Sequence, residues 1–271
     1  MNPAREEIKD PKAVTQHIKD LTLELGADTV GVALYDPQFT FTDSELPDHT
    51  RVIAYGVAMT YDVITDVGPD SQEEVHRVYY RLLDIGVRLA QYIGSMGYQA
   101  RAHPNGGELA HIPYAYLAGL GELGKRGSLI SPTLGSSFRL GLVSTDLPLE
   151  ADGPQDYGID STCERCTVCT QFCPAEAIHE EKQLVNGVLR FHVDTGACEP
   201  YFLQLWGCKI CLMVCAYNGR SIFKESYQPL GKDIARAKNA EGIIDLFASG
   251  APEPSGNEFL RAVQAKHSDN P

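Results

Sequence analysis

Apolar residues recur at two different spacings along the first 150 residues of the chain. Between Pro11 and Gly26 they lie three or four positions apart, which is the spacing of one face of a helix. Residues 29–34 and 51–59 are short and almost continuously apolar, as buried strands are. The pattern therefore predicts a helix and two strands, with the polar residues 35–50 as a loop between the strands.

The longest helical pattern begins near Ser71 and ends at Gly97. Ser71 and Glu74 have the spacing of a capping box, which marks the start of a helix. Seven apolar residues then repeat every three or four positions and predict one buried helix face. These residues are Val75, Val78, Leu82, Ile85, Leu89, Ile93 and Met96.

Shorter patterns complete the first part of the chain. We expect a strand at 98–102, a helix at 109–120 and a strand at 139–144. This mixture of helices and strands predicts an α/β (α+β) fold, with a domain boundary in the polar residues 150–160. The expected domains are a core over 1–157, a cysteine-rich domain over 158–219, and a C-terminal segment over 220–271 with a helix near 230–247 and a polar tail.

Composition and charge narrow the class of protein. The 271 residues are 43% hydrophobic and 22% charged, which is typical of a folded globular protein and excludes disorder of the whole chain. The net charge of −13 repels phosphate backbones, so we expect no nucleic-acid partner, whereas a basic electron-transfer protein would be attracted. The sequence has no run of about 18 apolar residues and no signal-like start, so we expect a cytoplasmic protein without a membrane span.

All eight cysteines lie between Cys163 and Cys215. In a reducing compartment, such crowding indicates metal binding or redox chemistry more often than disulfides. The first block has the spacing C-x2-C-x2-C-x3-C-P and ends at Pro174, and the second block has the spacing C-x9-C-x2-C-x3-C. The first spacing is that of bacterial ferredoxins, in which the fourth cysteine of a block binds the other of two clusters.

This crossing rule divides the cysteines into two sets of four and predicts two 4Fe-4S clusters. The first thiol set is Cys163, Cys166, Cys169 and Cys215, and the second thiol set is Cys173, Cys198, Cys208 and Cys211. A zinc ribbon and a disulfide framework are alternatives, because both also use closely spaced cysteines. The triple C-x2-C-x2-C spacing crowds a site for a single metal ion, which favours the clusters.

Two segments resemble a known family. Residues 113–149, with AGLGELG at 118–124 and TDLPL at 145–149, resemble the segment that precedes the clusters of corrinoid-dependent reductive dehalogenases. The same stretch is similar, less closely, to epoxyqueuosine reductases, and GCKICLMVCAYN at 207–218 resembles the second cysteine block of both groups. The resemblance covers about residues 51–219. It implies a nitroreductase-like core that binds cobalamin, with a two-cluster ferredoxin domain that passes electrons to cobalt.

The resemblance also implies a catalytic trio, which Tyr79, Asn105 and Arg139 match in this chain. Replacing the halogen of a small aryl organohalide with hydrogen takes two electrons and one proton. A tyrosine supplies that proton readily only with a cation such as Arg139 beside it, and Asn105 would hold the phenolate or the substrate. The alternative is that the three are an ordinary helix residue, turn residue and surface residue.

Six further residues are candidates for holding the cofactor. The glycine-rich turn would wrap a cofactor edge with backbone amides, and two histidines and a glycine lie around Asn105. These candidates are Gly119, Gly121 and Gly124 in the turn, and His103, Gly106 and His111 beside Asn105. Flavin competes with cobalamin as the cofactor, because other nitroreductase-like proteins bind it.

The predicted activity is reductive dehalogenation. Its expected partners are a small-molecule substrate, an external low-potential electron donor such as ferredoxin or flavodoxin, and a second copy of the chain or a partner subunit. An epoxyqueuosine reductase-like enzyme is the first alternative, disfavoured because Asn105 stands where that group implies an acidic residue. The second alternative is a non-catalytic electron-transfer or corrinoid-handling iron–sulfur protein.

Overall fold

The computed structural model divides into two compact units. The described residues are 4–41, 48–64, 69–185, 187–204, 206–215 and 217–218, so the predicted segment over 220–271 and its helix near 230–247 lie outside them. The sheet unit comprises residues 1–58, 76–122 and 138–157, and the cysteine unit comprises residues 59–75, 123–137 and 158–271.

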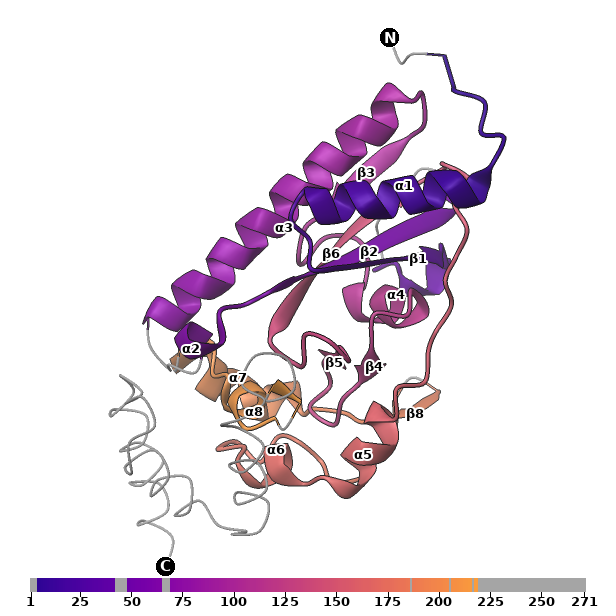
Figure 1. Ribbon diagram of the computed structural model, residues 1–271. Coiled ribbons are helices and arrows are strands. Elements are labelled where there is room, and N and C mark those ends of the chain that lie inside the picture. The colour runs from indigo at the N-terminus through magenta and orange to yellow at the C-terminus, as the bar shows by residue number, and fades with distance from the viewer. Residues whose placement is uncertain are drawn as a thin grey trace, which may run out of the picture. The chain divides into compact units, whose positions relative to one another are not determined.

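A four-stranded antiparallel sheet forms the centre of the sheet unit (Figure 1). Its strands are β1 Thr29–Leu34, β2 Arg51–Ala58, β6 Phe138–Thr145 and β3 Ala100–His103, in that spatial order. The helices around it are α1 Pro11–Glu24, the short 3-10 helix η1 Pro37–Phe39, α3 Pro69–Ser95 and α4 His111–Leu117. The first residues of α3, up to Val75, belong to the cysteine unit. The predicted mixture of helices and strands is confirmed.

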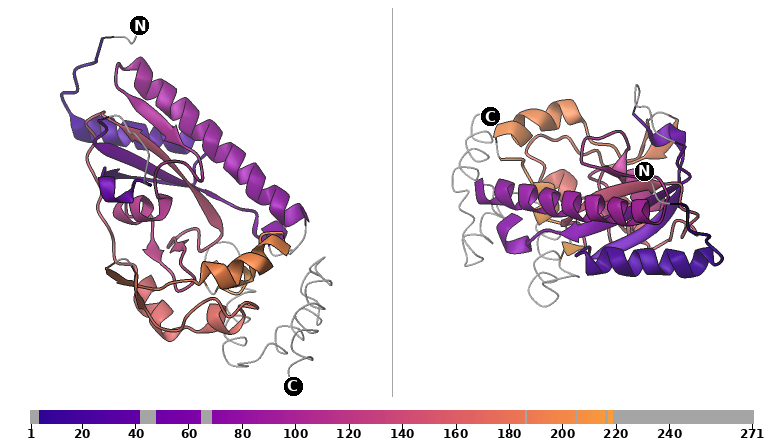
Figure 2. Two further views of the ribbon diagram at one scale, coloured as in Figure 1. Left: turned by 180° about the vertical axis from the view of Figure 1, so that it is seen from behind. Right: turned by 90° about the horizontal axis from the view of Figure 1, so that it is seen from above.

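Helices cover both faces of this sheet (Figure 2). Tyr55 of β2 points to one face, where its hydroxyl donates a 2.7 Å hydrogen bond to the carbonyl of Leu82 in α3. Gly31 of β1 points to the other face, where a Cβ atom would lie only 2.2 Å from the carbonyl oxygen of Ala118, which follows α4. The alternation of side chains along a strand thus separates an α3 face from an α4 face.

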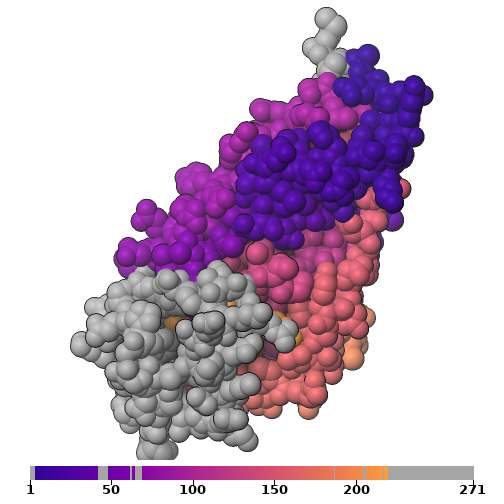
Figure 3. Space-filling view, viewed as in Figure 1, coloured from indigo at the N-terminus to yellow at the C-terminus, as the bar shows by residue number. Residues whose placement is uncertain are grey.

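Helix α1 lies on the same side of the sheet as α3 and forms part of the outer surface (Figures 1 and 3). The ring of His17 in α1 is 2.7 Å from the hydroxyl of Tyr92 in α3. Asp10 caps α1, accepting a hydrogen bond from the backbone N–H of Ala13. Gly26 follows the helix with φ at 107°, in the left-handed region that favours glycine.

The start of α3 differs from the prediction. The helix begins at Pro69, two residues before Ser71. The carboxylate of Glu74 accepts a 2.6 Å hydrogen bond from the backbone N–H of Thr60, so this side chain fixes the chain before the helix instead of closing a capping box. The prediction failed because the spacing of Ser71 and Glu74 carries no information about a partner that is distant along the chain.

The cysteine unit consists of short elements joined by turns. They are α2 Tyr61–Ile64, β4 Glu122–Leu123, β5 Leu129–Ile130, α5 Ile159–Arg165, α6 Val168–Gln171, β7 Gln183–Val185, β8 Val188–Arg190, α7 Thr195–Gln204 and α8 Ile210–Met213. β4 begins at the last residue of the sheet unit. Strands β4 and β5 form one two-stranded sheet, and β7 and β8 form another. Within the described ranges, no helix is long and apolar enough to cross a membrane.

Two small hydrophobic clusters pack around the cysteines of this unit. One contains Val168, Phe172, Ile210, Met213 and Val214, with Cys166, Cys169 and Cys208 packed against it. The other contains Ile130, Ile159, Cys163, Phe191 and Tyr217, with Cys215 packed against it. These five thiols therefore lie against apolar side chains of the unit.

The contact between Tyr55 and α3 can be tested with two alanine substitutions in one helix. Gly86→Ala should lower the free energy of unfolding by about 1–3 kcal/mol, because an inserted methyl group overpacks the site. The new Cβ atom would lie 2.5 Å from the Tyr55 hydroxyl and 3.2 Å from the Cβ of Ala102. Gly94→Ala meets nothing within 4 Å and should raise this free energy by about 0.5–1 kcal/mol. Urea denaturation measures both changes, and equal effects would contradict the packing argument.

Candidate functional site

A cavity of about 380 Å³ opens on the sheet unit between α3, β6 and the end of β3. Its lining combines aromatic, aliphatic and polar side chains. The lining residues are Tyr55, His76, Tyr79, Tyr80, Leu82, Leu83, Ala102, His103, Pro104, Asn105, Leu140 and Gly141. Two of the predicted catalytic residues, Tyr79 and Asn105, are among them.

Arg139 and Tyr79 contact each other beside this cavity. Arg139 lies on the α3 face of β6, because it is two residues from Gly141, which pairs with Tyr55. Its guanidinium carbon is 5.5 Å from the centroid of the Tyr79 ring. The arrangement is a cation–π contact, so the positive charge lies over the ring face. The Nε atom of Arg139 is buried, and no group of the described residues accepts its hydrogen bond.

Asn105 reaches the cavity from the loop between β3 and α4. The backbone N–H of Gly107 donates to the carbonyl of Pro104 at 2.9 Å, which closes a tight turn around Asn105. The predicted cofactor-binding residue Gly106 sits in this turn with φ at 78°, and a Cβ atom there would meet nothing within 4 Å. The structure thus brings Asn105 and Tyr79 to one cavity, with Arg139 against Tyr79.

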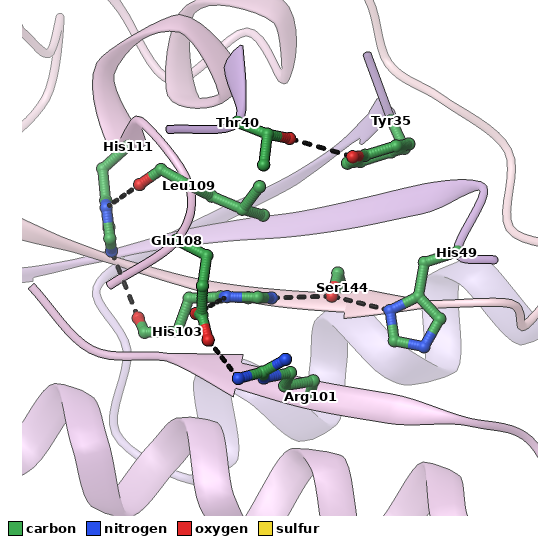
Figure 4. A network of polar contacts seen from close by, with 9 residues as sticks. All are labelled: Tyr35, Thr40, His49, Arg101, His103, Glu108, Leu109, His111 and Ser144. Carbon is green, nitrogen blue, oxygen red and sulfur yellow. Dashed lines mark hydrogen bonds and ion pairs between the residues drawn. The ribbon is translucent and has the colours of Figure 1, made fainter. Parts of the chain in front are cut away.

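A chain of polar contacts on the α4 face fixes the start of the loop that carries Asn105 (Figure 4). His103 is buried, with Nε2 2.7 Å from Ser144 Oγ and Nδ1 3.0 Å from Glu108 Oε2. Ser144 is also 2.7 Å from Nδ1 of His49, and Glu108 forms an ion pair with Arg101. With neutral rings, every donor in the chain points in one direction, from His49 through Ser144 and His103 to the Glu108 carboxylate.

The two histidines predicted to bind the cofactor use their ring nitrogens within the protein. Both nitrogens of His103 contact the groups described above. In His111, Nδ1 is 3.0 Å from the carbonyl of Leu109 and Nε2 is 3.2 Å from the carbonyl of His103. Burial lowers the pKa of each ring below its ordinary value, which favours the neutral form. A neutral His111 ring has one N–H, so it donates to only one of its two neighbouring carbonyls. These contacts favour a role in holding the loop, and cofactor binding by either residue stays a prediction.

The predicted glycines of the turn have packing reasons to be glycine. A Cβ atom at Gly119 would lie 3.0 Å from the carbonyl of Gly153, and its φ is 73°. A Cβ atom at Gly124 would lie 2.5 Å from Cδ1 of Ile130. Gly121 is buried. Close packing is enough to explain glycine at positions 119 and 124. Cofactor binding by Gly119, Gly121 and Gly124 therefore stays a prediction.

Most electrostatic interactions among the thiols join members of one predicted set, and the interaction between Cys169 and Cys211 joins the two sets. In the first thiol set, Cys215 acts on Cys163 and Cys169. In the second thiol set, Cys173 acts on Cys198 and Cys208. Among the described residues no three metal-binding side chains are arranged around a single ion. A four-iron cluster has a different requirement, because each of its four thiolates binds a different iron atom.

Buried thiols need compensation to become thiolates. Burial raises the pKa of Cys169 and of Cys211 to about 12, far above neutral pH. Backbone N–H groups supply part of the compensation: that of Lys125 donates to Cys163, and that of Ala177 lies 3.4 Å from Cys173 Sγ. The chemistry of the donors therefore suits a metal cluster that binds thiolate sulfur.

Two buried cations in the turn between β4 and β5 were not predicted as site residues. Lys125 and Arg126 are only 2% and 7% exposed. Nζ of Lys125 donates a 2.6 Å hydrogen bond to the carbonyl of Glu180 and lies 5.2 Å from the centroid of the Phe191 ring. Arg126 lies beside cysteines. The adjacent basic residues in a glycine-rich turn were a visible signal, but their burial depends on contacts that are distant in sequence.

Comparison with known proteins confirms the predicted resemblance. No protein-family profile matches the chain. The tetrachloroethene reductive dehalogenase of Sulfurospirillum multivorans is 29% identical over 79% of this chain and 52% of that relative. The epoxyqueuosine reductase of Lactococcus garvieae is 34% identical over 54% of this chain and 42% of that relative. The chain thus spans about half the length of these relatives, and both kinds of relative are oxidoreductases.

Solved structures agree with this result. A catabolic reductive dehalogenase in complex with 3-bromo-4-hydroxybenzoic acid is similar with a TM-score of 0.75 and 27% identity, over 88% of this chain and 37% of the other. The epoxyqueuosine reductase from Streptococcus thermophilus is similar with a TM-score of 0.58 over 95% of this chain and 86% of the other. Its identity of 19% supports similarity of fold alone.

The polar chain around His103 predicts a pH-dependent stability. Burial lowers the pKa of His103 in the folded state, so below about pH 6.5 the unfolded chain binds more protons and the free energy of unfolding falls as the pH falls. Between pH 7.5 and 5.5, His103 should contribute about 1 kcal/mol of this fall. Urea denaturation of His103→Gln should show a correspondingly shallower dependence. An unchanged slope in His103→Gln would refute the assignment.

Proposed function

We propose that the protein is a corrinoid- and iron–sulfur-dependent reductase that replaces the halogen of a small aryl organohalide with hydrogen. The observation that carries the proposal is the contact between the Arg139 guanidinium and the Tyr79 ring at the cavity. It pairs a proton donor with a fixed cation. Similarity to a reductive dehalogenase in complex with a brominated hydroxybenzoic acid supports this substrate class.

The cavity suits a substrate with one ring. Its volume of about 380 Å³ is near the lower end of the roughly 300–1,000 Å³ of small-molecule sites. The aromatic rings of Tyr55, Tyr79 and Tyr80 line it and can pack against a planar ligand. Asn105 at the opening supplies an amide that can accept or donate hydrogen bonds. These features favour an aromatic substrate with a polar substituent.

The cavity residues also fit a cofactor that borders them. The buried Nε of Arg139 is an unused donor that an acceptor of a bound ligand could satisfy. A corrin macrocycle is larger than the described cavity and would need surface beyond these lining residues. When bound, the corrinoid would supply a low-potential cobalt centre for cleavage of the carbon–halogen bond. Flavin remains the competing cofactor.

Tyr79 is proposed as the proton donor. The overall change takes in two electrons and one proton, forms a carbon–hydrogen bond and releases halide. Loss of the proton leaves Tyr79 as a phenolate, whose negative charge is shared with the ring. The Arg139 cation over that ring stabilises the anion, and Asn105 would orient the substrate.

The two thiol sets are proposed to hold two 4Fe-4S clusters that carry electrons from an external low-potential donor. The ferredoxin-like spacing of the first block and the electrostatic grouping of the thiols support this. Each cluster would accept one electron at a time, so two such transfers supply one turnover. A second copy of the chain or a partner subunit would complete the enzyme.

An epoxyqueuosine reductase-like activity is the second candidate, favoured by the 34% identity to one such relative. A structure of an epoxyqueuosine reductase contains a modified tRNA stem loop, so this activity would require tRNA binding. The net charge of −13 and Asn105 in place of an acidic residue argue against it. Incubation of reduced protein with a bromophenol and with the modified stem loop separates the two activities. Clusters without either turnover would favour a non-catalytic electron carrier.

The cluster content gives one test. Anaerobically prepared protein should contain about eight iron and eight sulfide per chain, because eight thiolates complete two four-iron clusters. Cys173→Ser should lower the iron content through loss of the second cluster, whereas Ser161→Ala changes an exposed residue outside both sets and should leave the content unchanged. Colorimetric iron and sulfide analysis measures both, and stoichiometric zinc in place of iron would refute the proposal.

The catalytic role of Tyr79 gives another test. Tyr79→Phe should leave cluster and corrinoid content intact and lower turnover of an aryl bromide by about two to four orders of magnitude, the usual range for a positioned proton donor. Tyr92→Phe removes a hydroxyl from the same helix where it contacts His17, and should keep wild-type turnover. Single-turnover assays with released bromide as the readout compare them.

A double variant strengthens this test. Arg139→Met should slow the same step, because the phenolate loses its cation. Its effect should be strongly non-additive with that of Tyr79→Phe, as for residues that act together. Wild-type turnover by Tyr79→Phe would show that the proton comes from another group.

A further inference from the structure

Arg126 is a buried cation among cysteines. It lies in the turn between β4 and β5 and is only 7% exposed. Its side chain forms a hydrogen bond with Cys215, and it also interacts electrostatically with Cys211 and Cys169. Cys215 and Cys169 belong to the first thiol set, and Cys211 belongs to the second. Arg126 therefore lies where the two thiol sets approach each other.

The guanidinium has donors left over. Two of its nitrogen atoms, Nε and Nη2, are buried and have no hydrogen-bond partner among the described residues. An unpaired buried donor is costly, and a buried charge without an opposite charge is more so. The groups that interact with it electrostatically are thiols, which carry negative charge only as thiolates. Burial of the Arg126 guanidinium is explained if negatively charged sulfur lies against it when the clusters are bound.

The neighbouring Lys125 provides a contrast. Its Nζ donates a hydrogen bond to the carbonyl of Glu180 and lies over the face of the Phe191 ring, so this cation has partners within the protein. Its backbone N–H, not its charge, contacts Cys163. Of the two adjacent cations, only Arg126 presents unused donors near thiols of both sets. The difference separates a structural cation from one that faces the redox centre.

We propose that Arg126 raises the reduction potential of the cluster bound by the first thiol set more than it raises that of the second. The inference rests on the proposed function only in that the thiol sets hold iron–sulfur clusters. Reduction adds one electron from an external reductant and one negative charge to the cluster, with no bond made or broken at Arg126. A fixed positive charge and hydrogen bonds to sulfur both favour the reduced form.

The hydrogen bond with Cys215 decides which cluster is affected more. Arg126 acts on the second set only through the charge interaction with Cys211, whereas it both bonds to Cys215 and interacts with Cys169 in the first set. Charge-assisted hydrogen bonds are roughly twice as strong as neutral ones. Arg126 should therefore raise the potential of the first cluster more than that of the second. Arg126 is a positioning residue in this proposal and contacts no substrate.

The potentials can be measured in the intact, anaerobically purified protein. Titration with dithionite and redox mediators, monitored by electron paramagnetic resonance, gives a midpoint for each cluster. Arg126→Met should lower the equilibrium constant for reduction of one cluster by about tenfold, which is about 59 mV for a one-electron couple. Arg126→Lys keeps the positive charge but lacks the planar guanidinium group, and should lower this equilibrium constant by a smaller factor. Arg165→Met removes an exposed charge of the same kind beside Cys166 and should change it less than twofold.

Each outcome bears on the proposal. Two clusters with unchanged midpoints in Arg126→Met, or an equal shift in Arg165→Met, would overturn it. If Arg126→Met loses iron, the proposal is tested by comparing Arg126→Lys with Arg126→Gln. A higher midpoint potential in the lysine variant than in the glutamine variant supports the role of charge, and equal midpoints overturn it. Loss of iron in all three variants would show a structural role instead. Wild-type protein without clusters would reject the proposed function itself, and the proposal with it.

Discussion

The ring of Tyr55 sets the distance between the sheet and α3, on which the candidate site depends. Its hydroxyl is bonded to the Leu82 carbonyl, and its ring occupies the space that side chains at Gly86 and Gly141 would fill. Both glycines let the helix and the strand approach the ring closely. Because the cavity opens between these elements, a thicker layer would separate Tyr79 from Arg139. The contact of Tyr79, the proposed proton donor, with the Arg139 cation is thus a consequence of core packing.

Much of the sheet unit could be predicted from the spacing of apolar residues, and its β1 strand has the predicted bounds. The start of α3 could not be predicted in this way, because the carboxylate of Glu74 accepts a hydrogen bond from the backbone N–H of Thr60. The family resemblance implied that Tyr79 and Arg139 act together. It did not predict the geometry of their contact. Whether the cation meets the ring face or the hydroxyl depends on the rotation of α3 and on the register that pairs β6 with β2, which no local pattern encodes.

The roles of the histidines show the same limit. As loop residues beside Asn105, His103 and His111 have ring nitrogens that appear free for a ligand in the sequence. In the fold, His103 lies between Ser144 and Glu108, and Ser144 comes from a different strand. Contacts between residues so distant in sequence decide whether an imidazole is a ligand or an anchor. The buried polar chain thereby holds the Asn105 loop against the sheet, so that Asn105 lies at the cavity.

The cysteine unit poses a complementary problem of charge. Burial raises the pKa of thiols such as Cys169 and Cys211, and it leaves the guanidinium of Arg126 with unused donors. Each group is unfavourable alone in an apolar interior. Thiolates that bind metal and a cation that faces them offset each other. With the proposed clusters bound, the same burial would couple folding of the unit to metal binding, and Arg126 would influence electron transfer.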